Sequence, residues 1–269
     1  MKRFLYPAAL AGLLVLLASG CALLLGDGFD PAADSGGALT DQEAVELTAA
    51  EIASASGGSV LHAFLMMSGT ALTSVDGPGH VQITPQQTSE PSSSFLEGNR
   101  DLSAAGEYDY VMVYEDSTGT EVDDVDATQI DATGTMGGTS ERTNGTATFS
   151  SDVALLLTDI NDGDDTATLD GEVEYDTSNG TFVRASGSEL SFTGDNTHTW
   201  QQVDVEAPTS RPDDYPEGGR IVVKASYRDG DGDTLWSGTV TFIFDGNETA
   251  RATVGGVGYE VNLETARIE

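Results

Sequence analysis

The stretch "GRIVVKASYR" (residues 219–228) decides the fold class, because apolar and polar side chains alternate along it. In an extended chain Ile221, Val223 and Tyr227 fall on one face, while Lys224 and Ser226 fall on the other. A strand with one apolar and one polar face is typical of an antiparallel sheet that packs on one side only. The sequence therefore predicts a mainly β protein.

The same period of two continues on both sides of this stretch. It is present in "EYDYVMVYED" (107–116), "LWSGTVTFIFDG" (235–246) and "GYEVNLET" (258–265). Turn-forming residues separate the runs at "DTSNGT" (176–181), "SGS" (186–188), "DGDGD" (229–233), "DGNE" (245–248) and "GGVG" (255–258). A spacing of about 8–12 residues suits consecutive hairpins. We expect about ten strands in an antiparallel meander that forms a strongly curved sheet, a half-barrel or a barrel.

A helix is predicted ahead of the strands. Thr40 and Glu43 have the spacing of a capping box, and Leu39 before the cap can pack onto the first turn. The apolar face of this helix is narrow and consists of Val45, Ala49 and Ile52. The apolar run "VLHAFLMM" (60–67) fits either a second helix or a buried strand, so one or two helices should pack on the sheet.

Composition divides the chain into five parts. We expect a signal peptide at 1–20, a lipid-anchored flexible tether at 21–38, a helical segment at 39–75, a loop at 76–100 and the antiparallel β domain at 101–269. The tether is rich in Gly, Pro and Asp, and the loop is rich in Pro, Ser and Gln, so neither has much to bury. Residues 39–269 are long enough for one globular unit with its own core.

The chain is strongly acidic, with 45 acidic and 11 basic residues and a net charge of −34. Lys2 and Lys224 are its only lysines. A surface this negative repels nucleic acid and anionic headgroups, so neither is an expected partner. High Asp with almost no Lys is the composition of a protein adapted to high salt, although an acidic exported protein in dilute medium has a similar charge.

The N-terminus has the plan of a secretory signal peptide: Lys2 and Arg3, an apolar run, and small residues before Cys21. The segment Ala18-Ser19-Gly20-Cys21 resembles the lipobox of bacterial lipoproteins, in which cleavage precedes a cysteine that is then diacylated. The resemblance covers only the first 21 residues, and Ala18 stands where the family prefers Leu. It implies cleavage between Gly20 and Cys21 and a membrane anchor on Cys21.

Three other interpretations of this segment remain open. An ordinary signal peptidase could cut after Gly20, the apolar run could span a bilayer uncleaved, or Cys21 could form a disulfide. As the only cysteine, Cys21 has no intramolecular mate. Ala22 follows it, and in enteric lipoproteins an Asp there resembles an inner-membrane retention signal. Export to the outer membrane is therefore favoured over the inner membrane in a Gram-negative cell.

Catalytic signatures are missing from the sequence. It has no GxSxG, HExxH, CxxC or Walker A motif, and no GxGxxG after a strand. His62, His80 and His198 are too dispersed to indicate zinc, and we expect His198 at a hairpin tip. No catalytic residue is nominated, and we expect no enzyme and no cofactor, with calcium as the exception considered next.

The best candidate for a ligand to a metal ion is the weak calcium motif Asp229, Asp231 and Asp233. An EF-hand loop takes ligands from positions one, three and five, a Gly at six and a Glu at twelve. Here Thr234 and Val240 stand at the last two positions, so the resemblance stops at three residues. Hairpin turns use the same Asp-Gly pairs for their backbone geometry, which makes a structural role the simpler interpretation.

Trp200 and Trp236 are weak ligand candidates, because exported β proteins often stack sugars on aromatic rings. Trp236 belongs to the apolar face of its strand, so core packing is the competing interpretation.

Three functions follow. The first is a non-enzymatic, membrane-anchored envelope lipoprotein with a structural or interaction role. The second, by analogy of architecture alone, is a half-barrel carrier or receptor for a lipid or other hydrophobic ligand. The third is an exported hydrolase, which needs a cleft with carboxylates of raised pKa. An apolar cavity on the order of several hundred Å³ would distinguish a carrier from a packed domain. Partner identity and oligomeric state do not follow from the sequence.

Overall fold

The computed structural model describes residues 38–53, 80–83, 105–122, 126–142, 144–159, 166–206 and 215–269, all within the unit Gly37–Glu269. In this part of the chain the helix α2 (Asp41–Ile52) precedes a run of strands. The strands are β1 (His80–Ile83), β2 (Ala105–Glu115), β3 (Gln129–Arg142), β4 (Gly145–Thr158), β5 (Thr166–Val183), β6 (Glu189–Glu206), β7 (Gly218–Arg228), β8 (Thr234–Ile243), β9 (Thr249–Val254), β10 (Val257–Asn262) and β11 (Arg267–Ile268).

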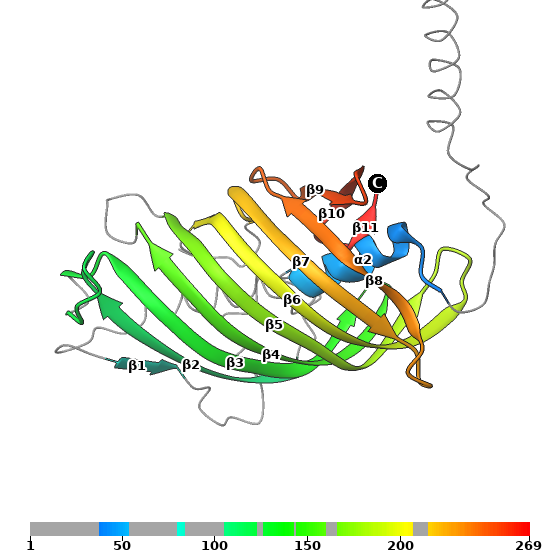
Figure 1. Ribbon diagram of the computed structural model, residues 1–269, viewed down its shortest axis with the longest axis horizontal. Coiled ribbons are helices and arrows are strands. Elements are labelled where there is room, and N and C mark those ends of the chain that lie inside the picture. Colours follow the sequence, from blue (N-terminus) through cyan, green and yellow to red (C-terminus); the bar gives the residue numbers. More distant parts are fainter. Residues whose placement is uncertain are drawn as a thin grey trace, which may run out of the picture. The chain divides into compact units, whose positions relative to one another are not determined.

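The described strands form a single eleven-stranded antiparallel sheet in sequence order, from β1 to β11. Among these strands β1 and β11 do not pair with each other, so the sheet is not closed into a barrel. The long strands from β3 to β8 curve together, and α2 lies on their concave side (Figure 1). The predicted mainly β meander with an N-terminal helix is confirmed.

The concave face of the sheet carries the core. Strand β4 shows the predicted alternation most regularly, with Phe149, Val153, Leu155 and Leu157 buried and exposed side chains between them. Buried apolar side chains from β2 to β10 form one core together with those of α2. Burial of each large aliphatic or aromatic side chain contributes about 1.5–3 kcal/mol, so this shared core holds the helix against the sheet.

Helix α2 begins where the sequence predicts, since both bonds of the capping box between Thr40 and Glu43 are present. Its predicted apolar face was too narrow, because all nine residues from Ala44 to Ile52 are buried. The core that the helix shares with the sheet includes its apolar residues Val45, Leu47, Ala49, Ala50 and Ile52. Two glutamates, Glu46 and Glu51, are buried with it.

Two turn or loop predictions are wrong. Strand β1 (His80–Ile83) lies within the segment 76–100 that we predicted to be a loop, and it pairs with β2 from His80–Val113 to Ile83–Tyr110. The segment 176–181 lies inside β5, with only a shift of register between Thr177 and Gly180. Gly180 is required by packing, because a Cβ there would approach the ring of Phe192 to 2.4 Å.

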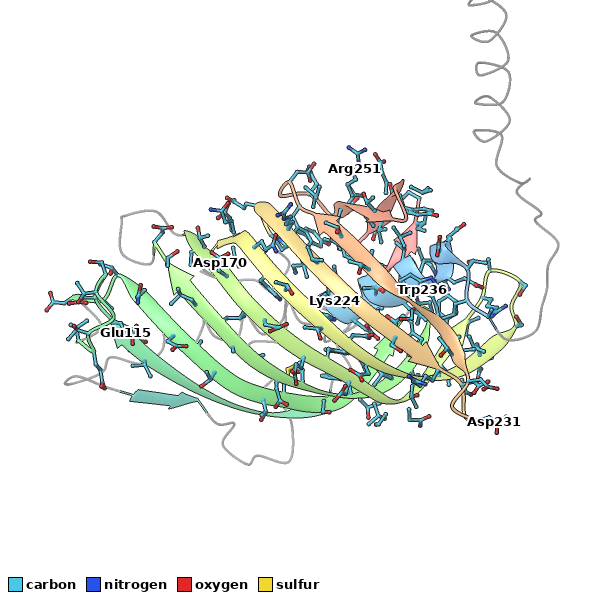
Figure 2. The ribbon with its side chains drawn as sticks, in the orientation of Figure 1. Glu115, Asp170, Lys224, Asp231, Trp236 and Arg251 are labelled. Carbon is cyan, nitrogen blue, oxygen red and sulfur yellow. The ribbon has the colours of Figure 1, made fainter. Side chains whose placement is uncertain are left out.

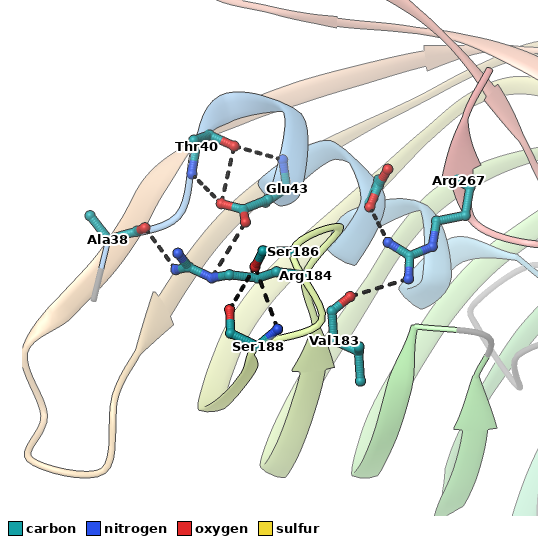
Figure 3. Close-up of polar contacts among 9 residues, drawn as sticks. Ala38, Thr40, Glu43, Val183, Arg184, Ser186, Ser188 and Arg267 are labelled. Atoms are coloured by element: carbon teal, nitrogen blue, oxygen red, sulfur yellow. Dashed lines mark hydrogen bonds and ion pairs between the residues drawn. The ribbon is translucent and has the colours of Figure 1, made fainter. Parts of the chain in front are cut away.

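The start of the described domain is held by one backbone hydrogen bond and by the side chain of Arg184, whose contacts are drawn in Figure 3. Leu39 N donates to Leu235 O at 3.0 Å, and Arg184 Nη2 donates to Ala38 O at 2.9 Å. Arg184 also forms an ion pair with Glu43 at 3.4 Å. The turn between β5 and β6 therefore holds the first turn of α2, where the predicted tether meets the domain.

Candidate functional site

A group of buried polar side chains lies where the C-terminal half of α2 meets β5, β6 and β7. Its members are Thr48, Glu51, Thr177, Asn196 and Tyr227. Asn196 Nδ2 donates to Glu51 Oε2 at 2.6 Å, and Tyr227 OH donates to the same oxygen at 2.9 Å. Thr177 Oγ1 donates to Glu51 Oε1 at 3.4 Å. We call these five residues the inner polar cluster.

Glu51 is the electrostatic centre of the inner polar cluster, and none of its side chain is exposed. A negative charge in the last turn of a helix is unfavourable with the helix dipole, and α2 has no basic residue in that turn. The hydroxyl and amide donors of Tyr227 and Asn196 offset part of the cost of burial. Thr48 Oγ1 lies 3.2 Å from the same Tyr227 hydroxyl and donates to Ala44 O, which extends the network along the helix.

A row of stacked rings crosses the concave face beside the inner polar cluster. Phe149 and Tyr175 stack at 5.2 Å, and Tyr175 and His198 stack at 5.4 Å. His198 is fully buried in the middle of β6, so its predicted position at a hairpin tip is wrong. The long strand β6 carries it across the concave face to meet Tyr175 of β5.

A second polar contact joins α2 to the end of the chain. Glu46 Oε2 forms an ion pair with Arg267 Nη1 at 2.7 Å, and Arg267 Nη2 donates to Val183 O at 3.2 Å (Figure 3). The guanidinium also lies 5.8 Å from the ring centroid of Phe182. Helix α2 is thus held by polar contacts at its start, its middle and its last turn.

The weak calcium motif has a structural role in the turn between β7 and β8. Asp229 Oδ1 accepts the backbone N–H groups of Asp231 at 3.0 Å and Asp233 at 2.9 Å. Gly232 provides the positive φ of 88° that the turn needs. In the described ranges no three His, Cys, Asp or Glu side chains are grouped to hold a metal ion.

The two tryptophans are not open stacking platforms. Trp200 is 1% exposed and belongs to the core, and its indole Nε1 has no hydrogen-bond partner among the described residues. Trp236 packs against the core at the rim, with its ring centroid 6.3 Å from that of Tyr227. Its Nε1 donates to Asp41 Oδ1 at 2.9 Å, so this ring supports the start of α2.

The convex face of the sheet carries acidic residues opposite one another. Asp152 of β4 pairs with Glu174 of β5, and Asp176 of β5 pairs with Asp195 of β6. Partial burial raises the pKa of Asp176 above its ordinary value, and the nearby carboxylates of Asp195 and Asp152 raise it further. Lys224 lies on the same face of β7 (Figure 2), as do Arg220 and Arg228. Like charges directly opposite each other destabilise a sheet, so this face should be sensitive to salt.

We therefore expect the melting temperature of the full chain, in nonionic detergent, to rise between about 0.1 and about 1 M sodium chloride. The Debye length shrinks from about 10 to about 3 Å over this range, which screens the opposed carboxylates. Relief of about 2 kcal/mol of repulsion corresponds to about 4–8 °C. A melting temperature that is flat or falls with salt contradicts the salt-adapted interpretation.

Single variants locate this effect. Asp176→Asn should raise the melting temperature by about 1–3 °C at low salt and by less at high salt. Because the pKa of Asp176 is raised in the folded state, its protonation at lower pH stabilises the fold, and that gain is lost as pH rises through the folded pKa. Glu260 lies opposite Arg251, so the matched control Glu260→Gln should not stabilise the protein.

Sequence reasoning missed the inner polar cluster entirely. A signal was present, since Glu51 lies four residues after Leu47 and seven after Ala44 and therefore shares a helix face with them. A carboxylate on that face indicates a buried charge, but its partners Asn196 and Tyr227 lie more than 140 residues away. Only the fold brings them together.

Gly20 and Cys21, where the sequence predicts cleavage and lipid attachment, lie outside the described residues, as does His62. Within the described ranges, α2 is too short and too polar to count as a membrane span, and no other helix there qualifies. Comparison with protein-family models, curated proteins and solved structures found no match.

Proposed function

We propose that this chain is an exported lipoprotein, anchored to the cell envelope through Cys21, whose acidic β domain has a non-enzymatic structural or interaction role. The observation that supports this best is the contact that holds Ala38, the first residue that the structure describes. Ala38 accepts a hydrogen bond from Arg184 and lies 17 residues after Cys21, and residues 27–37 have the composition of a flexible linker. The sequence predicted to be a tether thus leads directly to a residue that is bonded to the β domain.

The predicted tether sets the distance between the anchor and the domain. A Gly-rich coil of this length has an end-to-end distance of about 20–25 Å, and its fully extended limit is about 60 Å. The acidic domain is repelled by anionic headgroups, which favours the extended end of that range. A domain held away from the membrane in this way is suited to contact other components of the envelope.

The anchor is tested by fractionating cells that express the full chain or Cys21→Ser. We expect the native chain in the detergent-soluble membrane fraction after washes with high salt and with alkaline carbonate. The variant should be released or remain as the longer unprocessed form, because it has no thiol to acylate, whereas two or more acyl chains hold the native chain firmly on the membrane. Equal partitioning of both proteins contradicts the proposal, and Asp231→Ala is a control that should behave like the native chain.

A second candidate function is a carrier for a hydrophobic ligand, and one observation favours it. Trp200 presents a buried N–H donor without an acceptor on the concave face of an open sheet. Buried donors are normally paired, so a missing acceptor at this position suits a ligand that brings one, such as the ester or carboxyl oxygen of an acylated molecule. The cost of leaving the donor unpaired is about 1–3 kcal/mol.

Native mass spectrometry of the Cys21→Ser protein separates the two candidates, because this variant lacks the covalent lipid. A bound lipid that is lost in Trp200→Phe supports the carrier. Phenylalanine removes the N–H donor and keeps an aromatic ring in the core. Protein that is lipid-free when purified, and that stays so after incubation with phospholipid, supports the structural or interaction role.

A further inference from the structure

An open hollow of about 660 Å³ lies on the convex face, where β4 to β8 end or begin. Its lining includes Thr168, Asp170, Gln201, Asp204, Arg220 and Ile243. All six are on the side of the sheet opposite the core, and Asp170 lies near the ends of its neighbouring strands (Figure 2). We call this feature the rim hollow. Its volume is in the range of small-molecule sites.

The backbone of β5 and β6 is irregular where these strands line the rim hollow. The pairing register shifts between Leu169 and Gly171 in β5 and between Gln201 and Asp204 in β6. Gln202 has a φ of 50°, a conformation that costs energy for a residue with a side chain. Its backbone N–H donates to Asp170 Oδ1 at 2.9 Å, so the bulge and the carboxylate hold each other in place. Bulges of this kind re-aim side chains that a regular strand would hold apart.

The other polar groups of the rim hollow are also oriented. Thr168 Oγ1 donates to Asp204 Oδ1 at 2.8 Å, which leaves Oδ2 directed over Gly218. A Cβ at Gly218 would lie 2.8 Å from that oxygen, so glycine at this position makes room for the carboxylate. Arg220 Nε donates to Gln201 Oε1. Carboxylates, amides and a guanidinium are thus fixed around one hollow, beside the side chain of Ile243, which is 48% exposed.

The chemistry of this lining selects one class of ligand. Asp170 and Asp204 disfavour anions, and the polar groups disfavour an apolar ligand. No observation supports direct metal coordination, since the described residues contain no group of three His, Cys, Asp or Glu side chains placed to hold a metal ion. The hollow holds carboxylate acceptors and a guanidinium donor at fixed positions. Such a set matches adjacent hydroxyl groups, because a hydroxyl group both donates and accepts. The methyl groups of Ile243 suit the C–H face of a sugar ring.

We propose that the rim hollow binds a neutral carbohydrate, with Asp170 and Asp204 accepting hydrogen bonds from its hydroxyl groups and Arg220 donating to its oxygens. This site is on the face of the sheet opposite the inner polar cluster. It does not depend on the lipid anchor, so either proposal can fail while the other stands.

The test uses the full chain in a detergent without a sugar headgroup, at about 1 M sodium chloride to suppress non-specific cation binding. Cellobiose, chitobiose, maltose and mannobiose are titrated and followed by ligand-detected NMR. We expect saturable binding of at least one disaccharide, with a Kd of about 1 mM. Asp170→Asn removes a charged acceptor, and Gly218→Ala displaces the Asp204 carboxylate without changing any charge. Each should weaken binding at least about tenfold.

Control variants keep the result interpretable. Glu174→Gln, on the same face of β5 but outside the hollow, should bind the disaccharide as the native chain does. We expect Gly218→Ala to fold, since the only atom within 3.0 Å of its added methyl group is the end of the Asp204 side chain. Melting curves check this. The proposal is contradicted if no disaccharide saturates by about 10 mM, or if both variants bind as tightly as the native chain. It is also contradicted if spermidine, and no sugar, binds in a way that Asp170→Asn abolishes.

Discussion

Glu51→Ala should lower the melting temperature of the protein by about 6–12 °C, the largest effect we expect from a single polar substitution. The change removes the oxygen that accepts from Asn196 Nδ2 at 2.6 Å and from Tyr227 OH at 2.9 Å, in a fully buried position. Loss of a partner from a buried hydrogen bond costs about 1–3 kcal/mol. A total of about 3 kcal/mol corresponds to this shift for a domain of this size.

Thermal unfolding followed by circular dichroism measures the effect. The exposed residue Glu248 provides the control, and Glu248→Ala should melt within about 1 °C of the native chain. A double-mutant cycle between Glu51→Ala and Tyr227→Phe should give a coupling energy of about 1 kcal/mol or more, because the two side chains share one bond. If Glu51→Ala melts like the native chain, the inner polar cluster does not hold α2 in place.

Local patterns account for the parts of the fold that the sequence predicted. The alternation in residues 219–228 and 235–246 identified β7 and β8, because one face of each strand is buried and the other is not. The turn at 229–233 was found from its Asp-Gly pairs, which meet a local backbone requirement. The start of α2 was found for the same reason, since the capping box between Thr40 and Glu43 lies within four residues.

The parts that the sequence did not predict depend on contacts between distant segments. Gly180 belongs to a segment whose residues are typical of a turn, but it lies inside β5. Glycine is needed there because the ring of Phe192 occupies the space that a side chain would fill. The burial of all residues from Ala44 to Ile52 goes beyond the apolar face of α2 and depends on contacts with distant parts of the chain. His198 is placed by the length of β6, which no local signal encodes.

The candidate sites divide in the same way. Asp229, Asp231 and Asp233 are close in the sequence, and the backbone bonds accepted by Asp229 give this segment a role within its turn. The rim hollow joins residues of five strands, and its register shifts have no signature in the sequence. Electrostatic and packing partners of this kind become visible only when the strands are in register.

The second large effect concerns Cys21. The proposed cleavage before it would remove Lys2 and Arg3 but no acidic residue, so the proposed mature chain has 45 acids and nine bases, a net charge of 9 − 45 = −36. Cys21→Ser removes the thiol that would be acylated, and we expect complete loss of the lipid-modified form. Ala18→Leu, which restores the residue preferred in the lipobox, should leave processing intact.

The intact mass of the full-length protein, extracted from membranes with detergent, tests the lipid-anchored account most directly. If Cys21 is the lipid anchor, we expect a chain that has lost residues 1–20, begins at Cys21 and carries the added mass of two or three acyl groups. A mature N-terminus at any other residue, or an unmodified Cys21, would contradict it.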